Sequence, residues 1–159
     1  MSNRIADSKK YMLKLLVTYL STTAVMVVVD LIWLGLIAEP LYQQGIGHLM
    51  AEKPNIAAAI SFYALFPIGL MIFAILPVAT EAGWQHTALL AALFGFFAYA
   101  TYDLTNLATL KDYPLKLALI DIVWGSFVSA ISATAGKLVL NQYQKYLSHI
   151  FVGAYRNQP

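Results

Sequence analysis

Residues 13–37 read LKLLVTYLSTTAVMVVVDLIWLGLI, an almost wholly apolar run. A helix needs about 20 mostly apolar residues to cross a bilayer. Three more stretches meet this length, at about 56–79, 87–109 and 116–137. The whole chain is 60% hydrophobic and 11% charged, whereas soluble domains are roughly 45–50% apolar. The sequence therefore predicts an all-α protein, a four-transmembrane-helix bundle that forms a single domain over residues 1–159.

Both ends of the chain extend this plan. The N-terminal apolar run is too long for the core of a signal peptide, and no small-residue cleavage site follows it, so we expect a retained span. Residues 138–155 place apolar side chains on one helical face and polar ones on the other. This pattern predicts a C-terminal amphipathic helix, either at the membrane interface or as an extension of the fourth span. A helix that docks a partner is the alternative.

Lysine and arginine predict the orientation, because cytoplasmic loops carry an excess of them. Seven lie in the terminal segments and three in connections on the other side. The terminal set is Arg4, Lys9, Lys10, Lys14, Lys137, Lys145 and Arg156, and the other set is Lys53, Lys111 and Lys116. We therefore expect a multi-pass protein of the inner membrane with both termini in the cytoplasm.

Three aspartates interrupt the apolar stretches: Asp30, Asp103 and Asp121. An acidic side chain inside a bilayer costs about 2.5–3.5 kcal/mol on insertion scales and marks a functional site by default. With alternating helix directions and 1.5 Å of rise per residue, each carboxylate should lie about 8–11 Å below the outer end of its helix. Three helices would thus supply carboxylates to one layer in the outer half of the membrane.

Other polar and aromatic groups should join this layer. Each aspartate has a partner three residues later on the same helical face: Trp33, Asn106 and Trp124. Tyr63 and Tyr99 reach a similar depth. Four residues after Tyr63, Pro67 removes the hydrogen bond that the Tyr63 carbonyl would accept. The expected pocket is built by Asp30, Asp103, Asn106 and Asp121 with Trp33, Tyr63, Tyr99 and Trp124.

Carboxylates without cationic neighbours must take up a proton or bind a cation. Beside tryptophan and tyrosine they suit an organic cation. The first hypothesis is therefore binding or transport of a small or lipid-derived ligand, with or without coupling to protons or cations. A hard divalent ion on Asp oxygens and Asn106 is a variant of it. A structural subunit, in which the aspartates only join helices, is an alternative.

A membrane enzyme or an accessory subunit in fatty-acid or lipid modification is the other alternative, with acid–base work by paired carboxylates. Its catalytic residues and cofactors stay unknown, because no span contains histidine and neither G-x-S-x-G nor H-E-x-x-H occurs. The chain has no cysteine. The net charge of +2 does not favour nucleic acid as a partner. Membrane lipid is the expected surrounding partner, and four helices enclose so little volume that a homo-oligomer is plausible.

Three strings in the chain resemble the bacterial membrane-protein family named domain of unknown function 2177. They are VVVDLIWLGLIAEPLYQ, FYALFPIGLMIFAILP and ALFGFFAYATYDLTNLATLKDYPLKLALIDIVWGS, and YDLTN-x-AT-x-K-x-x-P is the most specific part. The resemblance covers roughly residues 20–130 and implies a small four-span bundle without an established activity. The family's gene neighbours, often enzymes that modify membrane fatty acids, favour the lipid alternative. The family-like residues are Asp30, Trp33, Tyr102, Asp103, Asn106, Asp121 and Trp124.

Overall fold

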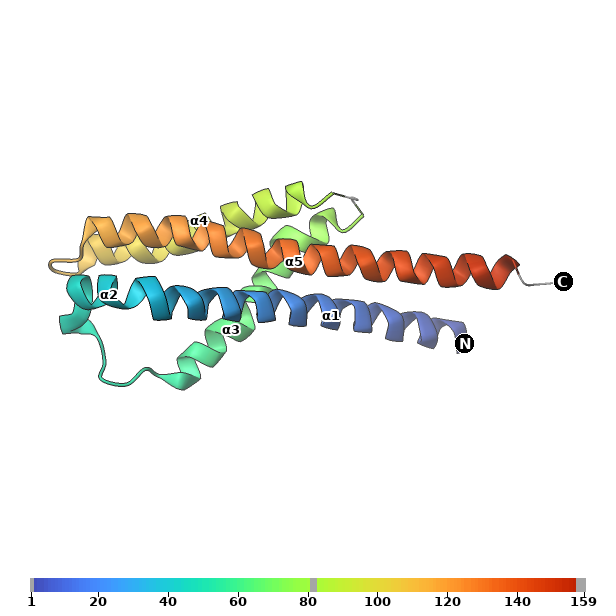
Figure 1. The fold of residues 1–159 in the computed structure, drawn as a ribbon, viewed down its shortest axis with the longest axis horizontal. Coiled ribbons are helices and arrows are strands. Elements are labelled where there is room, and N and C mark those ends of the chain that lie inside the picture. Colours follow the sequence, from blue (N-terminus) through green and yellow to red (C-terminus); the bar gives the residue numbers. More distant parts are fainter. Residues whose placement is uncertain (1, 81–82, 157–159) are drawn as a thin grey trace.

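The computed structural model describes the backbone of residues 2–80 and 83–156. Four long helices lie side by side, and the described residues contain no strand. They are α1 (Ser2–Trp33), α3 (Ile56–Leu70), α4 (Gln85–Thr109) and α5 (Leu115–Arg156) (Figure 1). Within the described part of the chain, four helical segments are long and apolar enough to cross a membrane. The predicted all-α bundle of four spans is confirmed.

The first span does not stop near Ile37. It continues through a π-helical turn, η1 (Leu34–Ala38), into the short helix α2 (Glu39–Ile46) and a 3-10 turn, η2 (Gly47–Leu49). Pro40 lies in the first turn of α2. The first turn of a helix tolerates proline because its N–H groups have no partner inside the helix. The Glu39 and Pro40 step, expected to be a connection, therefore begins a helix.

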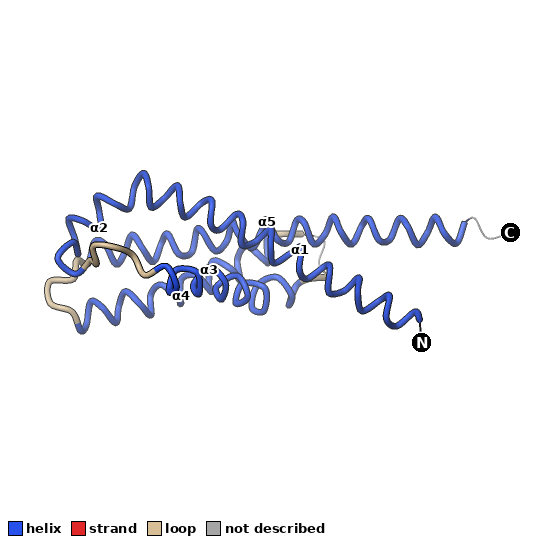
Figure 2. Tube along the Cα trace, turned by 90° about the horizontal axis from the view of Figure 1, so that it is seen from below, coloured by secondary structure: helices blue, strands red, loops and turns tan. Residues whose placement is uncertain are grey.

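The fourth span and the C-terminal tail form one continuous helix, α5. Of the two forms predicted for residues 138–155, the structure thus has the extension of the span. The tail side chains from Leu147 onward lie outside the described residues. Figures 1 and 2 show that α1 and α5 project beyond the other helices at the end where both termini lie.

Helices α4 and α5 pack closely because glycines lie where they meet. A Cβ atom on Gly95 would collide with the backbone oxygen of Gly125 and with Ser129, and a Cβ atom on Gly125 would collide with the Tyr99 ring. Small residues at such positions let two helix backbones approach each other. Other small residues of these two helices, Ala91, Ser129 and Ala133, are also buried.

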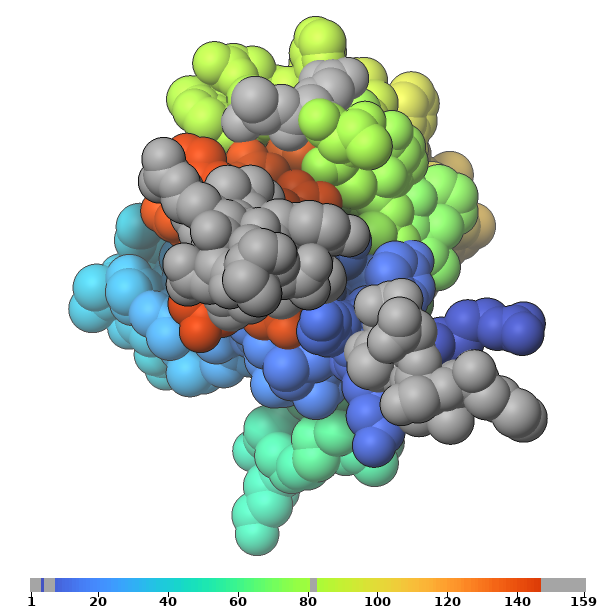
Figure 3. All heavy atoms as spheres, turned by 90° about the vertical axis from the view of Figure 1, so that its right-hand side faces the viewer, coloured from blue at the N-terminus to red at the C-terminus, as the bar shows by residue number. Residues whose placement is uncertain are grey.

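Helix α3 bends away from the bundle around Pro67, which lies inside the helix. The missing proline N–H loosens the helix, and a π-helical turn, η3 (Met71–Ile75), follows. At this bend the Tyr19 hydroxyl of α1 donates to the Ala64 carbonyl at 3.0 Å. The part of α3 that precedes Pro67 runs obliquely outward (Figure 1). Seen from the end where the termini lie, it projects from the rest of the molecule (Figure 3).

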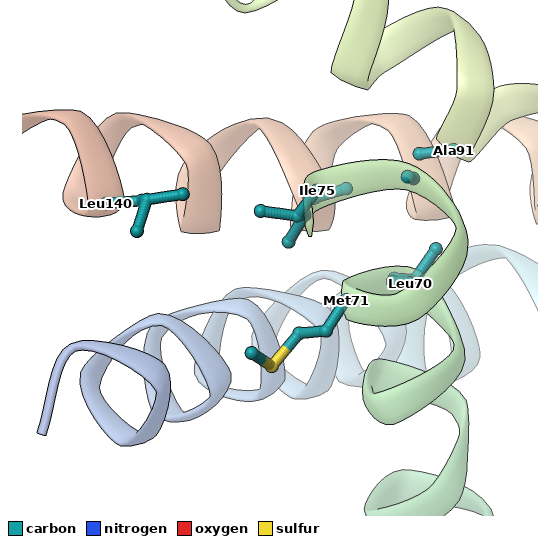
Figure 4. Packing of buried hydrophobic residues seen from close by; sticks show 7 residues of the cluster. Leu70, Met71, Ile75, Ala91 and Leu140 are labelled. Carbon is teal, nitrogen blue, oxygen red and sulfur yellow. The ribbon is translucent and has the colours of Figure 1, made fainter. Parts of the chain in front are cut away.

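The apolar core lies in the half of the bundle nearer the termini. It joins η3 to α4 and α5 through Leu70, Met71, Ala74, Ile75, Ala91, Ala133 and Leu140 (Figure 4). One cation lies beside this core. Lys137 is fully buried, and its Nζ donates to the Val78 carbonyl at 2.6 Å. Lys137 was expected among the positive charges of the terminal segments. Its ammonium group instead binds a carbonyl at the end of the second span, as lysines near helix C-termini do.

Because α4 and α5 approach closely, one added methyl group between them should destabilise the protein. We expect Gly95→Ala to lower the free energy of unfolding by about 1–3 kcal/mol, because its Cβ overlaps backbone that cannot rotate away. Thermal unfolding of the detergent-purified protein measures this. Gly35→Ala is the matched control, since no atom lies within 4 Å of its Cβ. Equal unfolding temperatures for the two variants would contradict the packing argument.

Candidate functional site

Asp30 lies near the end of α1, Asp103 near the end of α4 and Asp121 near the start of α5. Figure 1 shows these helix ends opposite the termini, where the turn between α4 and α5 lies. The exposed fractions of the three aspartates are 5% for Asp30, 0% for Asp103 and 3% for Asp121. Such burial in an apolar bundle requires that each carboxylate receive hydrogen bonds. Among the described residues, the hydrogen-bond donors to these acids are phenol and indole groups, and none is a cation.

Asp30 joins three helices. Its Oδ1 accepts a hydrogen bond from Trp124 Nε1 of α5 at 3.0 Å, and its Oδ2 accepts one from the Tyr63 hydroxyl of α3 at 3.2 Å. Tyr63 comes one turn before the bend at Pro67, so the outward course of α3 determines where its hydroxyl lies. The Asp30 carboxylate therefore holds the projecting part of α3 against α1 and α5.

Asp121 binds the short helix α2. The Tyr42 hydroxyl lies 2.5 Å from one carboxylate oxygen of Asp121 and 2.6 Å from the other. Apolar contacts seat α2 on α5, where Leu41, Tyr42 and Ile46 pack against Leu117 and Ala118. Helix α2 continues the first span past the π-turn η1. This continuation packs α2 against α5, so that Tyr42 lies beside Asp121 and can donate to it.

Asp103 is satisfied from the turn that joins α4 to α5. The Tyr113 hydroxyl donates to its Oδ1 at 2.9 Å, whereas its buried Oδ2 has no hydrogen-bond partner among the described residues. The turn passes through Asp112 with φ of 59°, a left-handed conformation that aspartate tolerates better than most residues. Burial raises the pKa of Tyr113, and the hydrogen bond to Asp103 raises it further. The phenol therefore keeps its proton and remains a donor.

A cavity of about 350 Å³ opens beside Asp30. It is lined by the Asp30 carboxylate, three tyrosines (Tyr42, Tyr63 and Tyr99), two tryptophans (Trp33 and Trp124) and the apolar Leu34, Ala59 and Phe62. The two indoles are stacked, with ring centroids 4.3 Å apart and an interplanar angle of 9°. The Trp33 Nε1 is buried and has no hydrogen-bond partner among the described residues.

Electrostatic interactions connect the cavity to the other two acids. Tyr99 interacts with Asp30, Asp103 and Asp121, and Asp121 interacts with both other carboxylates. The three acids still have separate partners, and the described residues include no group of three or more His, Cys, Asp or Glu side chains able to hold a metal ion. The three acids therefore form one polar cluster, and Asp30 is the member of the three that lines the cavity.

Of the nine predicted site residues, five line the cavity, two are buried acids, and two lie elsewhere. Asp30, Trp33, Tyr63, Tyr99 and Trp124 line the cavity, while Asp103 and Asp121 are buried beside it. Asn106 is half-buried and interacts with Tyr113. Tyr102 is 59% exposed and does not line the cavity, because its position on α4 turns the ring outward.

Tyr42 and Tyr113, which are the donors to Asp121 and Asp103, are not among the residues predicted for the site. Both lie outside the predicted spans, so neither was considered a partner of an intramembrane acid. A signal was present, because each buried acid needs a donor and a tyrosine lies in the residues just beyond the span ends. Such a search would have required knowing that α2 and the 110–114 turn fold back onto α4 and α5.

Removal of the Tyr113 hydroxyl should expose the cost of an unpaired buried carboxylate. We expect Tyr113→Phe to lower the free energy of unfolding by about 1–3 kcal/mol, because both Asp103 oxygens then lack a donor. Thermal unfolding measures the loss, and Tyr102→Phe, at an exposed position, is the control. In the Asp103→Leu background the Tyr113→Phe effect should shrink, since no acceptor remains; an undiminished effect would show that the hydrogen bond is not its cause.

One protein family matches most of the chain. Residues 15–138 match the family DUF2177, described as a predicted membrane protein. The matched range contains all three aspartates and every residue that lines the cavity. No curated protein and no solved structure matches the chain. On the extent of this match, and in agreement with the resemblance of its sequence strings, the chain belongs to the DUF2177 family of predicted membrane proteins.

Proposed function

We propose that the cavity beside Asp30 binds a small or lipid-derived ligand that carries a positively charged amine or ammonium group. The observation that supports this most directly is a buried carboxylate in the wall of a 350 Å³ cavity whose other walls are mainly aromatic. A cation near aromatic faces is attracted by the ring quadrupoles, with about 2 kcal/mol or more for a desolvated pair. Carboxylate and aromatic rings together therefore select positive charge.

The charges around the cavity support the same ligand class. No lysine or arginine of the described residues lines the cavity, and the two lysines nearest in sequence to the cluster, Lys111 and Lys116, have exposed side chains. In the part of the chain that the structure describes, Asp30 accepts its hydrogen bonds from two neutral donors, Trp124 and Tyr63. A ligand cation would supply the missing charge, and an acceptor atom on the same ligand could pair with the buried Trp33 N–H.

Proton coupling forms part of the proposal. A carboxylate that loses its charge on protonation no longer attracts a cation, so protons and the ligand would compete for Asp30. Asp121 interacts with Asp30 and Asp103, which would spread the effect of one bound charge over the cluster. The expected sign is weaker ligand binding as the pH falls.

A structural role is the second candidate, favoured by the hydrogen bonds of Tyr42 to Asp121 and of Tyr113 to Asp103. These pairs join α2 and the 110–114 turn to the bundle and would be needed even without a ligand. The two roles separate experimentally, because a purely structural cluster changes stability when mutated, whereas a binding site changes ligand affinity in a protein that stays folded.

Binding can be tested with a panel of primary amines and quaternary ammonium compounds on the purified protein. We expect at least one to raise the unfolding temperature, and Asp30→Asn to weaken its binding about tenfold or more, because the ion pair and its desolvated cation–π contacts are lost together. Binding to wild type should weaken at lower pH. The matched control is Glu39→Gln, an exposed acid at the same end.

An unchanged affinity in Asp30→Asn, or equal losses in both variants, would remove the cation site. Stability losses without any ligand effect in either protein would favour the structural role.

The charge distribution supports an inner-membrane protein with both termini in the cytoplasm. The structure has both termini at one end of the bundle and the aspartate cluster at the other (Figure 1). Seven of the ten lysines and arginines belong to the terminal segments, and positive residues favour the cytoplasmic side. The cavity would then lie in the outer half of the bilayer.

Reporter fusions test this orientation. A green fluorescent protein fused after residue 159 should fluoresce, and alkaline phosphatase fused there should be inactive. The same two reporters inserted after Lys53, in the connection before α3, should give the opposite pair of results. Active phosphatase at the C-terminus would reverse the assignment.

A further inference from the structure

An apolar groove lies on the lipid-facing surface between α1 and α5. It has a volume of about 460 Å³ and is lined by Trp33, Leu119, Ile120, Val123, Trp124 and Phe127. Several of these side chains are largely exposed, and Val123 reaches 70%. None of the six carries a charge, so the groove presents hydrocarbon to whatever occupies it.

The groove and the polar cavity share a wall. Trp33 and Trp124 line both of them, and these two indoles are stacked. One tryptophan comes from α1 and the other from α5, so the stacked pair fills the seam between the two helices. The polar chemistry of Asp30 therefore lies on one side of the pair, and an uncharged channel for hydrocarbon lies on the other.

We propose that the ligand of the Asp30 cavity is a membrane amphiphile, whose amine-bearing head occupies the cavity while its alkyl chain lies in the groove between α1 and α5. The inference rests on the proposed cation site and names its ligand class. Two neighbouring spaces of opposite character, which share the lining residues Trp33 and Trp124, match the two ends of such a molecule. Burial of each methylene in the groove adds to affinity. A water-soluble cation would leave the groove unused.

A second apolar groove offers a contrast within the same molecule. It lies between α1 and the region of the bend after α3, where Met12, Leu16 and Ile68 are among its lining residues. It shares no residue with the polar cavity. An alkyl chain in that groove would have no nearby carboxylate for its head, so this groove serves as an internal control for general lipid contact.

The test uses dodecylamine with a diazirine on its chain, added to the protein in phosphatidylglycerol nanodiscs. Photolabelled peptides are mapped by mass spectrometry, and butylamine binding is measured separately as a probe of the head site. In the wild-type protein we expect labels concentrated on residues 119–127. Val123→Trp fills the groove from an exposed position and should reduce this labelling about tenfold, since the buried methylenes supply the affinity, while butylamine binding stays unchanged.

Two variants separate the possible outcomes. Leu16→Trp, in the other groove, should leave the labelling as it is, and Asp30→Asn should remove both labelling and butylamine binding. Labelling that survives Val123→Trp but not Asp30→Asn would overturn the groove and leave the cation site standing. Labels spread over all lipid-facing helices, with no effect of Asp30→Asn, would overturn both. If Val123→Trp does not fold, Leu119→Trp, which is 55% exposed, replaces it.

Discussion

Hydrogen bonds from phenol and indole groups to three buried carboxylates are the interactions on which one end of this bundle depends. A carboxylate in hydrocarbon is costly unless donors surround it, and here every donor comes from a different element than the acid it serves. Asp30 joins α1 to α3 and α5, Asp121 joins α5 to α2, and Asp103 joins α4 to its following turn. The acids thus determine where the elements of this end meet.

The two halves of the molecule are packed by different kinds of side chain. Near the termini, apolar side chains hold the helices together, and the buried Lys137 donates a hydrogen bond to the Val78 carbonyl. At the other end, the part of α3 before Pro67 runs obliquely outward, and the cavity there is lined mainly by Asp30 and aromatic residues, together with Leu34 and Ala59. A cavity forms where close packing stops and hydrogen bonding continues.

The stacked indoles of Trp33 and Trp124 line both the cavity and the apolar groove beside it. They separate a space with a carboxylate from a groove without any charge. Our proposal assigns both spaces to one long molecule with a cationic head and an alkyl chain, because a metal ion or a soluble amine would leave the groove unused.

The sequence by itself determined the four spans, because apolar length and helical rise are local properties of the chain. It also predicted that Asp30, Asp103 and Asp121 share one depth, since depth follows from counting residues along straight helices. Only the tertiary structure decided that Tyr42 and Tyr113 are donors, that Tyr102 faces outward and that Lys137 is buried. These outcomes depend on the rotation of each helix about its axis and on where α2 and the turns fold back, and residue spacing within one helix does not encode either.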